Sequence, residues 1–188
     1  RDFGGLVYDS RIPAPGGLPW GTQGRALCLL SSGIDSPVAS WLAMKRGCEI
    51  THLHLDGGRW AGTDVKTTAI ENHRRLSRWC AGNPLMMVIA NSEPLYDRMQ
   101  ELRIPPRYRC VICKRFMLQV SSRLMQHEGA LAIITGENLG QVASQTLANL
   151  TVISDGISVP VLRPLITHDK EEIVTLARRI GTFDTHPG

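Results

Sequence analysis

The amino-acid sequence predicts an α/β fold in which a parallel five-stranded sheet carries helices on both faces. Apolar, strand-like runs alternate with helical segments along most of the chain. The strand-like runs are apolar at successive positions, as expected of strands buried on both sides, and this alternation is typical of parallel sheets. A chain of 188 residues, 43% of them hydrophobic, can bury one core and is most simply one domain.

The predicted elements follow one another in a regular order. The start of the chain is rich in turns, because "YDSRIPAPGGLPWGTQGR" holds three prolines and four glycines. The segment "GLVYDSRI" (residues 5–12), which overlaps the start of this turn-rich stretch, predicts one short strand. Further strands are predicted over residues 26–30, 49–55, 85–89, 130–135 and 161–163. Helices are predicted over residues 37–46, 63–81, 94–101, 110–127, 140–150 and 170–180. Ligands of such sheets bind at the carboxyl ends of the strands, where the strand order reverses.

Composition and charge narrow the class of protein. A formal net charge of +4 permits nucleic-acid or phosphate partners without requiring them. No segment resembles a signal peptide and no apolar run reaches the length of a membrane span, so we expect a soluble, cytoplasmic protein with no membrane partner. The five cysteines are an odd number without scaffold-like spacing, which argues against a secreted disulfide protein. Cys28, Cys48 and Cys80 are expected to be packing residues.

The segment "SSGIDS" (residues 31–36) joins the first predicted long strand to the first helix. Asp35 and Ser36 are candidate helix caps, and Pro37 suits the first helical turn. A loop between a strand end and a helix N-terminus offers free backbone N–H groups and the positive end of a helix dipole, which together favour an anion. Gly33 allows close approach of the backbone to a ligand. Asp35 would repel a bare phosphate, so it predicts Mg²⁺ held between the carboxylate and phosphates. The alternative is a capped turn without a ligand.

Several sequence blocks resemble one known family. "SSGIDS" resembles the pyrophosphate loop (PP-loop), Ser-Gly-Gly-x-Asp-Ser, of the N-type ATP pyrophosphatases, with Ser32 in place of the first glycine. "PGGLPWGTQGR", "CKRFML", "ITGENLGQVASQTLANL" and "VLRPLITHDKEEIVTLARRIGT" together resemble the tRNA 4-thiouridine synthetase (ThiI) family, from about residue 15 to residue 182. The resemblance implies the PP-loop fold of the adenine nucleotide alpha hydrolase-like (HUP) class. It also implies ATP-dependent tRNA sulfurtransferase activity, with a link to thiamine biosynthesis.

The same resemblance implies a set of nucleotide contacts. ATP is expected at Leu29, Leu30, Ser31, Ser32, Gly33, Asp35, Ser36, His54, Leu55, Lys114, Gly136 and Gln145, with Asp35 as a catalytic residue that holds Mg²⁺ through the phosphates. Some of these residues have independent support, because a lysine supplies charge to phosphate and strand ends line ligand sites. Without the resemblance, His54 reads as a buried, satisfied histidine, and Lys114 and Gln145 read as helix-surface residues.

The pair Cys110 and Cys113 lies in a basic segment, "RIPPRYRCVICKR". At the predicted helix start, the dipole and nearby cations would lower the thiol pKa. Four interpretations of the pair are open. The cysteines could carry sulfur in catalysis, supply two ligands of an iron–sulfur cluster, supply two ligands of zinc, or pack in the core. Zinc would need two further ligands and a cluster at least one. In the family that this chain resembles, the third cysteine follows the Ile-Gly-Thr segment. In this sequence no cysteine lies between that segment and Gly188.

The cations around this pair also predict a contact with RNA. Arg107, Arg109 and Arg115 supply charge, and Tyr108 supplies a ring on which a base can stack. The alternative is a solvated basic face.

The resemblance extends to domain organisation and partners. Residues 25–188 are expected to form the PP-loop ATP pyrophosphatase domain, and residues 1–24 a linker with a remnant strand of a preceding THUMP module, which holds tRNA in the family. The expected partners are tRNA, ATP and a sulfur donor (a cysteine desulfurase or sulfide), and a homodimer is left open. Two other functions remain open: a PP-loop ligase or amidotransferase with a non-RNA substrate, and a non-catalytic nucleotide-binding module.

Overall fold

The computed structural model of the chain describes residues 9–10, 14–142 and 144–185. Most of the strand predicted over residues 5–12 lies outside these residues. Five strands form one parallel sheet: β1 (Arg25–Leu29), β2 (Glu49–Asp56), β3 (Met86–Asn91), β4 (Ala132–Ile134) and β5 (Val161–Leu162). Their order in the sheet is β3-β2-β1-β4-β5, and every neighbouring pair is parallel. The predicted fold class is thereby confirmed.

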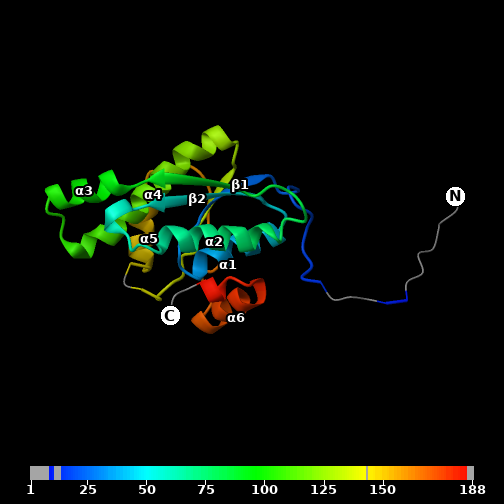
Figure 1. Cartoon of the computed structure of the whole chain (residues 1–188). Helices are drawn as coiled ribbons and strands as arrows, with labels where there is room; N and C mark the ends of the chain where they lie inside the picture. Colours follow the sequence, from blue (N-terminus) through cyan, green and yellow to red (C-terminus); the bar gives the residue numbers. More distant parts are fainter. Residues whose placement is uncertain (1–8, 11–13, 143, 186–188) are drawn as a thin grey trace.

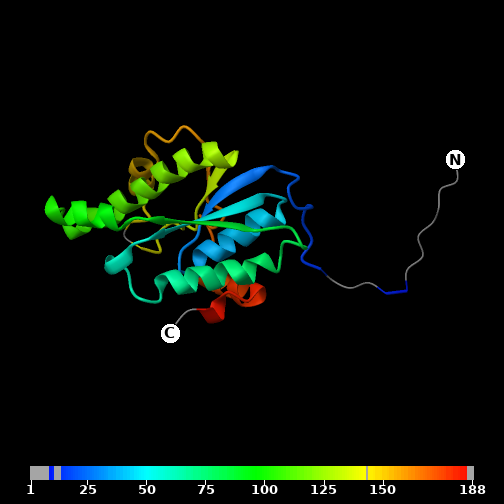
Figure 2. The same cartoon turned by 45° about the horizontal axis from the view of Figure 1, so that its top comes forward.

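Helices cover both faces of the sheet (Figures 1 and 2). They are α1 (Asp35–Lys45), α2 (Val65–Ser77), α3 (Glu93–Glu101), α4 (Pro106–Glu128), α5 (Leu147–Ser154) and α6 (Lys170–Ile180), with short 3-10 helices η1 (Gly58–Trp60) and η2 (Phe183–Thr185). No helix in the described part of the chain is long and apolar enough to cross a membrane.

Alternate residues of β1 pack into two different cores. Ala26 and Cys28 lie among buried side chains of α1, α2 and α6. Leu27, between them, packs with Leu118 of α4 and Ile153 of α5 on the opposite face. Successive side chains of a strand point to opposite faces, so a strand that is buried on both faces must be apolar throughout. This explains why the strand-like runs of the sequence show no polar alternation.

The first helix ends as predicted but begins differently. Gly47 adopts a positive φ of 86°, and its N–H donates to the Met44 carbonyl at 2.9 Å while the Cys48 N–H donates to the Ala43 carbonyl at 3.2 Å. These two bonds form the Schellman termination that favours glycine. At the other end, Ile34 rather than Asp35 or Ser36 is the N-cap, and it makes no side-chain capping bond. The Ser36 hydroxyl is instead engaged within the loop.

Three other predicted helix boundaries are wrong. The predicted helix over residues 140–150 begins only at Leu147, because Thr146 adopts an extended conformation and its hydroxyl accepts from the Asn149 N–H. The long helix begins at Pro106 instead of Cys110, since a proline fits its first turn. The second helix ends at Ser77, ahead of a turn in which Ala81 has a positive φ of 50°.

Candidate active site

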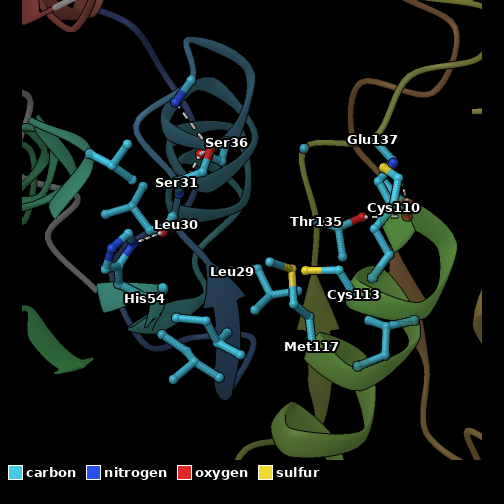
Figure 3. Close-up of a pocket in the computed structure, with 18 of the residues that line it drawn as sticks. Leu29, Leu30, Ser31, Ser36, His54, Cys110, Cys113, Met117, Thr135 and Glu137 are labelled. Atoms are coloured by element: carbon cyan, nitrogen blue, oxygen red, sulfur yellow. Dashed lines mark hydrogen bonds and ion pairs between the residues drawn. The ribbon is translucent and has the colours of Figure 1, made fainter. Parts of the chain in front are cut away.

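A cavity of about 570 Å³ opens at the carboxyl ends of β1, β2 and β4. In the sheet, β2 lies on one side of β1 and β4 on the other, so the strand order reverses at this point. Figure 3 shows the loop after β1 on one side of the cavity and helix α4 on the other. The nucleotide contacts expected from the sequence, apart from Ser32, line this cavity: Leu29, Leu30, Ser31, Gly33, Asp35, Ser36, His54, Leu55, Lys114, Gly136 and Gln145. Cys110 and Cys113 line it too.

The loop of residues 31–36 is closed by its own hydrogen bonds. The Ser31 N–H donates to Ser36 Oγ at 2.9 Å, and the two serine hydroxyl oxygens lie 2.9 Å apart. The Gly33 N–H donates to Ser31 Oγ at 3.1 Å. The two serines therefore hold the loop around the first turn of α1, as a rigid anion site requires. Ser32 does not line the cavity.

Gly136 sets how closely this loop can approach β4. A Cβ atom on Gly136 would lie 2.7 Å from the Ser36 nitrogen and 2.9 Å from the Asp35 carbonyl carbon. Real Cβ atoms do not approach backbone this closely. The sequence predicted a glycine that admits a ligand, and the structure shows one that admits the N-terminus of α1. Gly136 therefore fixes the packing of the loop as well as lining the cavity.

Asp35 is paired with a residue that sequence reasoning missed. Lys170, the first residue of α6, donates from Nζ to Asp35 Oδ1 at 2.9 Å. The N-cap of α6 is Asp169, whose carboxylate accepts from the Glu172 N–H while the Glu172 carboxylate accepts from the Asp169 N–H. This capping box fixes the start of α6. It thereby places the ammonium group of Lys170 beside the loop.

A second missed residue, Glu137, joins two cations at the cavity wall. Its Oε2 accepts from Arg163 Nε at 2.8 Å and from the Thr135 hydroxyl at 3.1 Å. Its Oε1 lies 3.4 Å from Lys114 Nζ, an ion pair without hydrogen-bond geometry. Glu137 is only 8% exposed, and a buried carboxylate needs such partners. Together these groups leave one net positive charge beside the cavity.

His54 stands at the end of β2 and is tied to the neighbouring strand. Its Nδ1 lies 2.9 Å from the Leu30 carbonyl oxygen, and the residue is 3% exposed (Figure 3). Its Nε2 and the Oε1 of Gln145 are buried without a hydrogen-bond partner among the described residues. Buried polar atoms in native proteins are nearly always hydrogen-bonded. These two atoms are therefore candidates for contacts with a ligand.

The cysteine pair differs from expectation in its acidity. Because α4 begins at Pro106, the pair lies beyond the first turn, where the helix dipole acts most strongly. Cys110 is exposed and Cys113 is half-buried. Burial raises the pKa of the Cys113 thiol above its usual value; a hydrogen bond to Tyr96 opposes this shift, Cys110 adds to it, and Lys114 also opposes it. The predicted lowering of the thiol pKa is therefore wrong for Cys113.

Tyr96 of α3 is a third missed residue. Its hydroxyl oxygen lies 3.2 Å from Cys113 Sγ. Burial, followed by this contact, raises the pKa of the Tyr96 phenol well above its usual value. The hydroxyl therefore keeps its proton and can donate to the sulfur.

The predicted RNA-contacting residues divide into two groups. Arg107 stacks over the exposed ring of Tyr108, with 4.8 Å between its guanidinium carbon and the ring centroid. Arg109 lines the cavity, and its Nε donates to the Ile104 carbonyl at 3.0 Å. Arg115 points elsewhere, because it pairs with Asp155 at 3.1 Å and donates to the Val152 carbonyl of α5. Among the predicted RNA contacts, Arg107 and Tyr108 are thus the exposed residues.

The donor set at the cavity fits some metals better than others. Among the described residues, no three His, Cys, Asp or Glu side chains are grouped to hold a metal ion. The two thiols alone are fewer ligands than zinc or an iron–sulfur cluster requires. Mg²⁺, in contrast, is commonly held by one or two carboxylates together with substrate phosphates. Asp35, beside the anion loop, suits that mode.

Signals for the missed residues exist in the sequence but are not specific. Glu137 lies three residues after the end of β4 in "ITGENLG", and Lys170 stands at a helix start in "THDKEE". Strand ends and helix starts of parallel sheets gather at one edge, which makes any polar residue there a candidate. The partners of these residues could not be assigned, because they lie far away in the sequence.

Comparison with known proteins agrees with this geometry. The thiamine biosynthesis protein (ThiI) family matches residues 21–187. A probable tRNA sulfurtransferase of Methanothermobacter thermautotrophicus is 42% identical over 181 residues, which are 95% of this chain and 46% of the relative. One of Moorella thermoacetica is 43% identical over 184 residues, 98% of this chain and 46% of the relative. The chain thus spans about half the length of these relatives.

A solved structure resembles the chain in three dimensions as well. The crystal structure of a 4-thiouridine synthetase–RNA complex with bound ATP superposes with a TM-score of 0.86 at 40% identity, over 90% of this chain and 44% of that one. The sequence blocks, the loop after β1 and the family match over residues 21–187 lead to the same assignment. The chain belongs to the ThiI family.

Proposed function

We propose that this chain is the ATP-dependent catalytic part of a tRNA sulfurtransferase, which adenylates a tRNA uridine and replaces its O4 by sulfur to form 4-thiouridine. One observation carries the proposal: the loop at the N-terminus of α1, the half-buried Lys114 and a pair of cysteines line the same cavity. Phosphate chemistry and sulfur chemistry can therefore act on one substrate. The similar structure, described as a 4-thiouridine synthetase with RNA and bound ATP, supports this reading.

The first step is adenylation. The uridine O4 attacks the α-phosphorus of ATP, an O–P bond forms, and the bond to pyrophosphate breaks. The ammonium group of Lys114 holds the phosphates together with backbone N–H groups of residues 31–36 other than those of Ser31 and Gly33, which bond to serine hydroxyls. Catalysis is therefore mostly positioning and charge neutralisation. When Mg²⁺ is bound through the phosphates, it supplies further charge neutralisation. Asp35 would hold it in place of the ammonium group of Lys170.

The second step transfers sulfur. A persulfide on Cys113 or Cys110, formed with sulfane sulfur from a donor such as a cysteine desulfurase, attacks C4 of the adenylated uridine; the C–O bond breaks and AMP leaves. The other thiol then attacks the sulfur–sulfur bond, which releases 4-thiouridine and leaves a Cys110–Cys113 disulfide for an external dithiol to reduce. Sulfide is the alternative donor, and it would attack C4 of the adenylated uridine directly, without a persulfide. A cluster at the pair would need a ligand from outside the described residues, and no step is derived through it.

RNA would reach the cavity past the accessible basic segment. Arg107 and Tyr108 lie two to three residues before the cysteine pair on α4, and combine charge with an exposed ring. Arg109 lines the cavity itself, and Arg115 would have to leave its ion pair with Asp155 to contact RNA. We also propose that residues 25–188 act as the PP-loop domain, and that residues 1–24 link it to a tRNA-holding THUMP module. A tRNA substrate favours the cytoplasm as the site of action. A homodimer stays a prediction.

The decisive experiment measures pyrophosphate release from Mg²⁺–ATP with and without unmodified tRNA. Wild type, Asp35→Ala and Asp184→Ala are compared, because Asp184 is an exposed aspartate outside the cavity. We expect release that requires tRNA, survives Asp184→Ala and falls by at least about 100-fold in Asp35→Ala. Release that is indifferent to tRNA would instead favour a ligase or amidotransferase with a non-RNA substrate. ATP binding without release would favour a non-catalytic nucleotide-binding module.

A further inference from the structure

The ring of Trp60 is exposed at the cavity and is held there by polar contacts. Trp60 ends η1, between β2 and α2, and it lines the cavity although the residue is 44% exposed. Its Nε1 donates to Asp97 Oδ1 at 2.7 Å, and the same oxygen accepts from Arg59 Nη2 at 2.6 Å. Asp97 belongs to α3, so an element other than its own fixes the orientation of the indole.

This exposure leaves a planar apolar surface uncovered. Tryptophan is large and highly buried on average in folded proteins. The guanidinium carbon of Arg59 lies 5.8 Å from the centroid of the Trp60 ring. An indole has two faces, and at 44% exposure Arg59 covers only part of this one. The ring is therefore available to a group that enters the cavity.

A short series of contacts joins Trp60 to the cysteine pair. The Trp60 N–H donates to the Gly57 carbonyl at 3.1 Å, which closes the turn of η1. A Cβ atom on Gly57 would lie 3.3 Å from Cε2 of Tyr96, so this turn packs against the Tyr96 ring. The Tyr96 hydroxyl oxygen lies 3.2 Å from Cys113 Sγ. Successive residues of α3 thus contact the thiol and hold the indole.

The charges beside the ring suit a neutral group better than a phosphate. Arg59 lies 3.1 Å from Glu93 and 2.6 Å from Asp97, so two carboxylates surround one cation. An RNA phosphate at this place would be repelled by the excess negative charge. A base carries no charge and can lie against the Trp60 ring.

We propose that Trp60 is the stacking platform for the base of the target uridine and holds that base within reach of the cysteine pair. The inference deepens the proposed function and rests on it, since it assumes a tRNA substrate. A base that reacts inside a cavity has to leave the stack of its neighbours in RNA. Stacking on an aromatic side chain compensates for the stacking that is lost.

Tyr108, the ring that the sequence suggested for stacking, does not have this position. It is 49% exposed and does not line the cavity, whereas Trp60 does. Tyr108 therefore suits a nucleotide that flanks the target. The adenine of ATP is the other planar group that could lie on Trp60, and the contacts of Tyr96 with the turn and with Cys113 favour the uridine, because C4 of the uridine has to reach a thiol.

The first test compares Trp60→Phe, which keeps an aromatic ring, with Trp60→Leu, which keeps only apolar bulk. Leu131→Ala is the control, because Leu131 is 67% exposed at the amino end of β4 and does not line the cavity. In tRNA-dependent pyrophosphate release, kcat/KM for tRNA should fall about tenfold in Trp60→Leu and stay within about threefold of wild type in Trp60→Phe. Leu131→Ala should match wild type. Calorimetry without tRNA should give the same dissociation constant of ATP for all four proteins.

The second test locates the base itself. The product, tRNA that contains 4-thiouridine, forms covalent adducts with neighbouring groups under long-wavelength ultraviolet light. This tRNA is irradiated while bound to wild type, and the adduct is identified by protease digestion and mass spectrometry. We expect the modified nucleotide on the peptide that contains Trp60, and loss of that adduct in Trp60→Leu.

The outcomes distinguish failure of the inference from failure of the proposed function. Weaker binding of ATP by Trp60→Leu, with unchanged kcat/KM for tRNA at saturating ATP, would assign the ring to adenine and overturn the inference. Equal kcat/KM for tRNA in wild type and Trp60→Leu, or an adduct on Tyr108 and not on Trp60, would overturn it while the proposed function stands. If tRNA evokes no pyrophosphate release by wild type, the proposed function fails and this inference fails with it. Unchanged far-ultraviolet circular dichroism of the variants shows that folded proteins are being compared.

Discussion

Lys170 Nζ and Asp35 Oδ1 lie 2.9 Å apart, although 135 residues separate them in the sequence. The contact joins the start of the last long helix to the loop that follows the first strand. It holds the carboxylate of Asp35 beside the ammonium group of Lys170. The pair is accessible to solvent, so its contribution lies in the placement of Asp35 and not in the stability of the fold.

Lys170→Gln should therefore damage catalysis and spare the fold. Lys66→Gln is a matched control, because Lys66 also lies 2.9 Å from an aspartate, Asp56, with similar exposure of both side chains. We expect pyrophosphate release to fall by at least about tenfold in Lys170→Gln and to persist in Lys66→Gln. Both should keep the free energy of unfolding within about 1 kcal/mol of wild type. Equal release by the two variants would contradict a role of Lys170 at the loop.

Gly136→Ala should destabilise the protein because its Cβ would meet the backbone of Ser36 at 2.7 Å. Overpacking of this kind costs about 1–3 kcal/mol, and here it also displaces the loop. Gly62→Ala is the control, since its nearest neighbour, Val65 Cγ2, lies 3.7 Å from the added Cβ. Urea unfolding should show a lower free energy of unfolding for Gly136→Ala only. A wild-type value for Gly136→Ala would mean that α1 can shift without cost.

Glu137→Gln should be destabilising for an electrostatic reason. It leaves Lys114 and Arg163 beside each other without their shared carboxylate. Removal of one member of a buried charge cluster costs about 3–5 kcal/mol. Glu101→Gln breaks the exposed pair with Arg98, and should change the free energy of unfolding by less than about 1 kcal/mol. Chemical unfolding of both variants measures the difference, and equal effects would show that Glu137 does not neutralise the two cations.

Substitution of the cysteines should separate the two steps. Cys113→Ser and Cys110→Ser should keep tRNA-dependent pyrophosphate release within about twofold of wild type and lose 4-thiouridine formation, because only sulfur transfer needs a thiol. Cys48→Ser, at a half-buried cysteine that does not line the cavity, should keep both activities. Nucleoside digestion and mass spectrometry of the tRNA measure the product. Parallel loss of both activities in the variants of the pair would argue for a structural role.

The pH dependence of stability should reveal a histidine pair between β2 and α2, in which His52 is buried and His73 half-buried. His52 Nδ1 lies 2.9 Å from His73 Nδ1, and burial, followed by the charge of His73, lowers the pKa of His52 from 6.5 to about 3. Below pH 6.5 the unfolded chain therefore binds more protons than the folded protein, so stability is lost as the pH falls. The slope should reach about 1.4 kcal/mol per pH unit for this histidine between about pH 6 and pH 4.

His52→Gln cannot titrate and should flatten that slope, whereas His127→Gln, at an exposed histidine of α4, should not. Urea unfolding at several pH values measures both. An unchanged slope in His52→Gln would mean that other groups, and not His52, cause the acid sensitivity.

The sequence by itself determined the class of the fold and the place of the site. Strand-like runs that are apolar on both faces require a sheet covered on both sides. Residues 31–36 form the loop between a strand and the N-terminus of a helix, where an anion site is expected. These are local properties, which depend on the period of the side chains and on the free N–H groups of a helix start. His54 and Lys114 were expected only because of the family resemblance, and both line the cavity.

Only the tertiary structure decided how those residues are paired and how acidic they are. Lys170 reaches Asp35, Glu137 lies between Lys114 and Arg163, and Tyr96 contacts Cys113, each from another part of the chain. A hydrogen bond or a pKa depends on the partners and on the burial of a group, and neither is a property of its neighbours in the sequence. The thiol pKa expected from a helix start was wrong for this reason. The carboxyl ends of the strands bring the site residues together. Contacts between distant segments of the chain then determine the ion pairs, hydrogen bonds and pKa values of those residues.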